Sequence, residues 1–182
     1  MHYLKETQMF NFVNLDQTTR KFILEAIDEA ERTGNIYYST RFNQAGNQQW
    51  LPLLREAAQS FNEHWLAFQL ETKVLMKDFE TARKPTGGYT TKHIPHTASE
   101  TMADGQFNRF YILGLCKRAR SEGITHLVVY RAKAVKDPRP ESEALVGTSL
   151  SIDDIESQLK TKQASFKSPL VRPNSGLTVK LP

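Results

Sequence analysis

The sequence predicts an α+β fold, with a mostly helical N-terminal half packed against a small mixed or antiparallel sheet and a long helix in the C-terminal half. Apolar residues recur at helical spacing over most of residues 1–83. Runs of β-branched and aromatic residues are short and lie mainly after residue 120. A chain of 182 residues, 39% of them hydrophobic, suffices for one core. We therefore expect one domain over 1–182, made of a helical half (1–83), a linker (84–96) and an α+β half (97–182).

The first half contains three expected helices and one short strand. Asp16 is the expected N-cap of the first helix, and Gly34 its left-handed C-terminal residue. Residues 36–38 are a strand candidate. A second helix is expected over 49–61, where Pro52 would occupy the first turn. A third, capped by Asn62, is expected to run through Val74 to Phe79 with a break near Thr72.

The second half begins after the Pro- and Gly-rich segment 84–96. Thr97 and Glu100 have capping-box spacing, so a helix is expected there that Gly105 ends. The main helix is expected over 106–122, and the best strand over 126–135. Ser151 is expected to cap a last helix reaching about residue 163, and 177–181 alternates like a terminal strand. We expect the sheet to combine the Tyr37, Val128 and Val179 regions.

Positive charge is concentrated in the second half. Residues 1–91 contain 10 Lys and Arg against 11 Asp and Glu, whereas residues 92–182 contain 14 against 9. Seven cations within this half are expected to form a surface that binds nucleic acid or an acidic protein: Arg109, Lys117, Arg118, Arg120, Arg131, Lys133 and Arg139. The alternative is an ordinary solvated face, with Arg109 paired to a carboxylate and Asn108 tying down a helix start.

The sequence is also compatible with two other classes of function, a small enzyme and a structural protein. A small enzyme would use Arg109, Tyr111, Arg131 and Glu141 in a pocket for a phosphorylated small molecule, with Asn108 and Ser142 as further pocket candidates. A structural protein of a virus particle would use the segment 170–182 to add a strand to a neighbouring copy. The leading hypothesis is non-enzymatic binding of an anionic partner.

Several site types are not expected. Cys116 is the single cysteine, so neither an internal disulfide nor a thiolate zinc site is available. His93 and His96 are separated by Pro95 and therefore do not have the spacing of metal ligands on a helix, so we expect no metal and no cofactor. Phosphate-binding loop, dinucleotide-turn and nucleophile-elbow motifs are not found. Without a long apolar run or a secretory pattern, the expected location is the cytoplasm, or a virion if a phage encodes the protein.

Four stretches resemble a family of short uncharacterised proteins encoded by bacteria and bacteriophages. They are Gly105-Gln-Phe-Asn-Arg-Phe-Tyr111, Val129-Tyr-Arg-Ala-Lys133, Pro138-Arg-Pro-Glu-Ser-Glu143 and Pro173-Asn-Ser-Gly-Leu177. The resemblance implies no catalytic role. It implies a module carried by phage or other mobile DNA, with a role in nucleic-acid binding, virion assembly or interference with a host.

Overall fold

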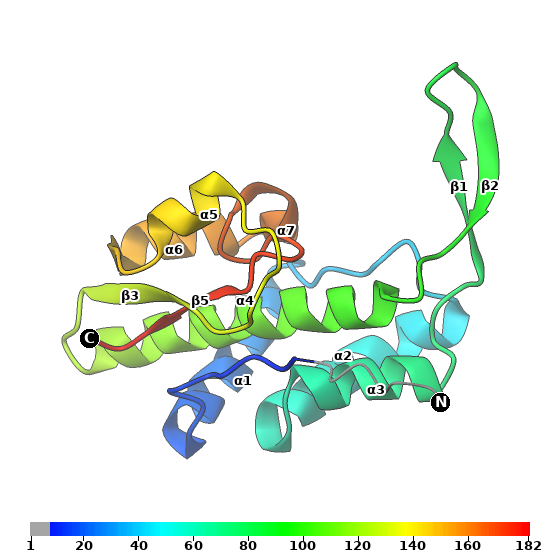
Figure 1. Ribbon diagram of the computed structural model, residues 1–182. Helices are drawn as coiled ribbons and strands as arrows, with labels where there is room; N and C mark the ends of the chain where they lie inside the picture. Colours follow the sequence, from blue (N-terminus) through cyan, green and yellow to red (C-terminus); the bar gives the residue numbers. More distant parts are fainter. Residues whose placement is uncertain (1–7) are drawn as a thin grey trace, which may run out of the picture.

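The computed structural model describes residues 8–182 and has the expected α+β fold, with one long helix at its centre. In Figure 1 this helix, α4, crosses the molecule between a layer of α1, α2 and α3 and a layer made of a small sheet with α5, α6 and α7. The helices are α1 Gln17–Arg32, α2 Gln44–Ser60, α3 Glu63–Thr72, α4 Ala98–Ser121, α5 Pro140–Leu145, α6 Ile152–Leu159 and α7 Ala164–Lys167. The strands are β1 Phe79–Arg83, β2 Tyr89–His93, β3 His126–Arg131, β4 Ser149–Ser151 and β5 Leu177–Lys180.

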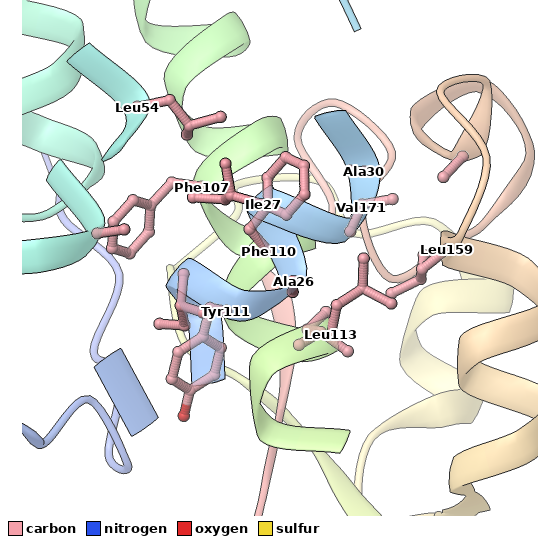
Figure 2. Close-up of a cluster of buried hydrophobic side chains, with 14 of the residues drawn as sticks. Ala26, Ile27, Ala30, Leu54, Phe107, Phe110, Tyr111, Leu113, Leu159 and Val171 are labelled. Carbon is pink, nitrogen blue, oxygen red and sulfur yellow. The ribbon is translucent and has the colours of Figure 1, made fainter. Parts of the chain in front are cut away.

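Helix α4 carries the core because its middle is buried on every side. Phe107, Phe110 and Tyr111 are all at most 1% exposed, and Figure 2 shows them beside Ile27 of α1. Gly114 permits the close approach of α1, because a Cβ atom there would lie 2.7 Å from the backbone nitrogen of Ile23. The expected break at Gly105 is wrong, since α4 is continuous from Ala98. A helix packed on both faces tolerates the modest propensity penalty of one glycine.

Local capping signals predicted several helix boundaries correctly. The Asp16 side chain accepts from the Thr19 backbone, Asn62 caps α3, which ends at Thr72, and Ser151 caps α6. Helix α2 begins earlier than expected because Asn43 caps it by accepting from the Gly46 backbone. Pro52 therefore lies inside α2 and not in its first turn.

The three-stranded sheet is antiparallel, with β3 between β4 and β5. The expected pairing of the Val128 and Val179 regions is confirmed, since Val129 lies opposite Val179. The expected strand at Tyr37 is wrong, because that segment lies outside every strand and β4 takes the third place. The segment 170–182 supplies β5 to its own chain's sheet.

A β-hairpin forms where the sequence predicted the end of the third helix and the linker 84–96. Strands β1 and β2 pair antiparallel from Phe79 opposite His93 to Arg83 opposite Tyr89. Gly87 and Gly88 adopt positive φ angles of 91° and 77° in the connecting turn, a conformation that glycine adopts without strain. Figure 1 shows the hairpin projecting from the body of the molecule. Neither strand contributes a side chain to the hydrophobic core.

Candidate functional site

Arg109 lies inside the protein and not on its surface. Its side chain is fully buried, and its guanidinium donates to the backbone oxygens of Leu159 at 2.8 Å, Lys160 at 3.0 Å and Asn35 at 3.1 Å. Two of these carbonyls end α6, so the cation also opposes the negative end of that helix. Burial lowers the pKa of Arg109 to about 10. The residue joins α6 to α4, and the expected partner, a carboxylate, is replaced by backbone carbonyls.

The three other cations of α4 are paired with carboxylates of α1, α6 and the two helix ends at Asp16 and Glu122. Lys117 contacts Glu29 of α1 at 2.5 Å. Arg118 bridges Asp16 and Glu122, each at 2.8 Å. Arg120 contacts two carboxylates of α6, at 3.0 and 2.8 Å. These contacts attach α1 and α6 to the C-terminal half of α4 and cancel most of the local positive charge.

The cations on and after β3 are also engaged. Arg131 pairs with Glu143 and donates to the Ser175 carbonyl at 2.5 Å. Lys133 contacts Glu100 at 2.8 Å and Asp104 at 2.5 Å. Arg139 donates to the Pro173 carbonyl at 3.2 Å. The seven predicted cations therefore do not form an uncompensated basic surface, because six carry a carboxylate partner or lie buried.

The four candidate pocket residues are also buried or paired within the protein. The buried Asn108 amide donates to the carbonyls of Leu170 and Leu177, at 3.1 and 2.8 Å. Tyr111 is fully buried, and burial raises the pKa of its hydroxyl well above the usual range. Glu141 pairs with Arg172 at 3.2 Å, and Ser142 is buried in α5. Glu141 and its neighbour Glu143 both pair with arginines, Arg172 and Arg131.

A different group of cations is exposed on the turn and second strand of the β1–β2 hairpin, which we call the hairpin tip (residues 83–92), although Lys92 lies near the base, opposite Glu80. The tip contains three basic residues and no acidic one. Arg83 and Lys84 are exposed, and within residues 8–182 their side chains have no charged partner. Lys92 shares Glu80, at 3.4 Å, with Arg41, whose guanidinium holds the same carboxylate at 2.7 Å. The tip therefore retains a net positive charge after its ion pairs are counted.

Aromatic and hydroxyl groups accompany these cations. Tyr89 is 74% exposed, the highest value among the exposed large hydrophobic side chains. Thr90 and Thr91 follow it on β2, where every residue is exposed. At the base of the hairpin, the Phe79 ring lies 4.2 Å from the His93 ring, centroid to centroid. Cations, hydroxyls and a free aromatic ring on a narrow ribbon are the groups that contact nucleic acids.

Two other candidate reactive side chains, Cys116 and His93, are packed against the protein's own residues. Cys116 is fully buried, and burial raises the pKa of its thiol to about 12, so it is not a nucleophile at neutral pH. His93 packs on Phe79, and within the described part of the chain no cluster of three His, Cys, Asp or Glu side chains has metal-binding geometry. Across residues 8–182, no helix combines the length and the apolar character that crossing a membrane requires.

Comparison with known proteins does not assign this site. Protein-family models, curated proteins and solved structures were all compared with the chain, and none matches.

Proposed function

We propose that this protein is a non-enzymatic nucleic-acid-binding module that contacts duplex DNA through the hairpin tip. The observation that carries the proposal is the projecting ribbon on which Arg83 and Lys84 have no carboxylate partner within residues 8–182. The predicted cations of α4 and of residues 131–133 are instead occupied by the protein's own acidic side chains or, for Arg109, by backbone carbonyls. At Arg83 and Lys84 an anionic partner would meet positive charge without first breaking an ion pair.

The dimensions of the ribbon suit a groove of DNA. Each strand has five residues, which at about 3.3 Å per residue extends roughly 17 Å. The major groove is about 12 Å wide and admits a two-stranded β-ribbon. In such an arrangement Arg83, Lys84 and Lys92 would neutralise phosphates, and Tyr89 would contact sugars or base edges. Contacts between cations and phosphates would supply most of the affinity for DNA. Because phosphates carry no sequence information, we do not expect strong sequence specificity.

The test is fluorescence anisotropy with a labelled duplex across a salt series. If three phosphates are neutralised, the affinity falls about 40-fold between 50 and 200 mM salt, since the logarithmic slope is about −0.9 per phosphate. The triple variant Arg83→Ala, Lys84→Ala, Lys92→Ala should lose this binding and its salt dependence. A matched triple variant, Lys21→Ala, Lys73→Ala, Lys162→Ala, removes three exposed cations from other elements and should retain the binding.

Two outcomes would overturn the proposal. One is a binding curve that does not respond to salt, because contacts with phosphates release counterions. The other is an equal loss in both triple variants, which would assign binding to overall charge and not to the tip. Binding to an acidic polypeptide but not to a duplex would replace DNA by an acidic protein as the partner.

A further inference from the structure

A cavity of about 380 Å³ lies beside the N-terminal half of α4, on a part of the protein that the hairpin does not use. Its walls come from α4 and from two segments far apart in the sequence, 133–137 after β3 and 171–176 before β5, together with Phe10. We call it the α4 cavity. Its volume falls in the range of small-molecule sites, which are concave and occur where separate chain segments meet.

The two segments are held in place by bonds that do not depend on a ligand. The Gly176 carbonyl accepts from the backbone nitrogens of both Ala132, at 2.8 Å, and Lys133, at 3.1 Å. Gly176 adopts φ +64°, and a Cβ atom there would lie only 2.1 Å from the Lys133 carbonyl oxygen. The Asn108 amide fixes the second segment from beneath, through Leu170 and Leu177. The cavity is therefore preformed, which reduces the entropy lost when a ligand binds.

The inner wall of the cavity offers hydrogen-bond acceptors. Asp104 uses one carboxylate oxygen, Oδ2, to accept from Lys133, and within residues 8–182 no side chain or backbone donor contacts the other oxygen. Lys133 is itself held between Asp104 and Glu100 and lies 5.8 Å from the centre of the Phe10 ring. An N–H group of a ligand could donate a hydrogen bond to this second oxygen of Asp104.

The rest of the lining combines apolar side chains, two cations and the carboxylate-bearing Asp137. Phe10, Val135, Val171 and Pro173 supply apolar surface that suits a flat ring system. Of these two cations, Lys136 is exposed and has no ion-pair partner within the described residues, and Arg172 has one partner, Glu141, at 3.2 Å. An anionic group on the ligand would lie against these two cations.

We propose that the α4 cavity binds a nucleoside monophosphate, with N–H groups of the base on Asp104, the ring against the apolar wall and the phosphate beside Lys136 and Arg172. Inorganic phosphate would use only the cations of this lining, and an uncharged nucleoside would leave them unused, whereas a nucleoside monophosphate would use the acceptor, the apolar surface and the cations together. The site is separate from the hairpin tip, so either proposal can fail without the other.

The experiment is a thermal-shift and calorimetric titration of the full chain with purine and pyrimidine nucleoside monophosphates, the matching nucleosides and inorganic phosphate. At a hundredfold excess over Kd, a monophosphate should raise Tm by about 5 °C or more. Lys136→Ala should weaken binding about tenfold, the effect of one charge-assisted hydrogen bond. Ala134→Trp, which fills the exposed side of the cavity, should abolish it.

Both substituted positions are exposed, so the folded state should tolerate the changes. Lys162→Ala and the hairpin-tip triple variant are the controls and should bind the nucleotide as the unmodified protein does. Equal responses to monophosphate and inorganic phosphate would overturn the proposal, and so would binding that survives Ala134→Trp. No response to any nucleotide would overturn it as well, whatever the outcome with duplex DNA.

Discussion

Glu63 shows how one buried carboxyl makes stability depend on pH. Its side chain is 1% exposed, one oxygen accepts from the Phe10 backbone at 2.7 Å, and within residues 8–182 the other has no partner. Burial is the main reason that its pKa rises from 4.5 to about 7. Because the folded-state pKa lies above the unfolded one, the stabilising contribution of this group is complete below pH 4.5 and is lost as pH rises through 7.

The corresponding prediction concerns Glu63→Gln, which imitates the protonated carboxyl. A shift from 4.5 to about 7 corresponds to about 3 kcal/mol. The variant should therefore be nearly as stable as the unmodified protein at pH 4.5 and more stable at pH 8, by up to about 3 kcal/mol. Urea denaturation at the two pH values measures the difference. Glu71→Gln, on the exposed side of the same helix, is the control, and an equal effect of Glu63→Gln at both pH values would contradict the prediction.

At the scale of elements, Arg109 and Arg120 attach the same helix, α6, to α4 in two different ways. Arg109 is buried and donates to the carbonyls at the end of α6. Arg120 is 54% exposed and pairs with two carboxylates of α6. Buried polar groups are costly to leave without partners, whereas exposed ion pairs contribute little. The two residues are therefore a matched pair for testing what attaches α6.

Arg109→Ala should destabilise the protein by about 3 kcal/mol or more, because it removes a large side chain from the core and leaves several carbonyls unpaired. Arg120→Ala should cost less than about 1 kcal/mol. Chemical denaturation of both variants, followed by circular dichroism, gives the comparison. Similar small losses in both would mean that Arg109 is dispensable for the fold, and its role in joining α6 to α4 would be wrong.

A structural feature could be predicted from the sequence when the residues that determine it are close together in the chain. Helix ends depend on one or two nearby residues, so Asp16, Asn62 and Ser151 predicted theirs correctly. Ion pairs depend on residues far apart in the sequence. Arg118 and Asp16 are 102 positions apart, so the cluster of cations in the sequence did not reveal that folding would neutralise it.

The hairpin was missed for a different reason. Both of its faces are largely exposed, so its strands lack the alternation of apolar and polar residues that identifies a half-buried strand. Pro85, Gly87 and Gly88 then suggested a linker, although the same residues form its turn. The available signal was two five-residue segments, 79–83 and 89–93, separated by a short loop that contains Gly-Gly. The candidate site lies in this segment, and it therefore escaped prediction together with the hairpin.

For the whole molecule, the structure separates a core that determines stability from a hairpin that does not. The buried cluster draws on α1, α2, α3, α4, α6, β3 and β5, and no residue between 77 and 97 belongs to it. An ion pair of Arg41 with Glu80 attaches the base of the hairpin to the body. This pair is bidentate and half-buried, and Glu80 lies at the base of the hairpin, so the pair does not depend on the residues beyond it.

Replacing residues 81–91 by a short Gly-Ser loop should therefore lower Tm by only a few degrees, because the two ends of the segment are adjacent across the ladder, Glu80 opposite Lys92. The same deletion should eliminate duplex binding in the anisotropy assay, since it removes Arg83, Lys84 and Tyr89 together. Thermal unfolding and anisotropy on one preparation test both statements. A deletion that unfolds the protein would contradict the separation of core and hairpin. A stable deletion that still binds DNA would move the contact surface to the body, where the unpaired exposed lysines would be the next positions to substitute.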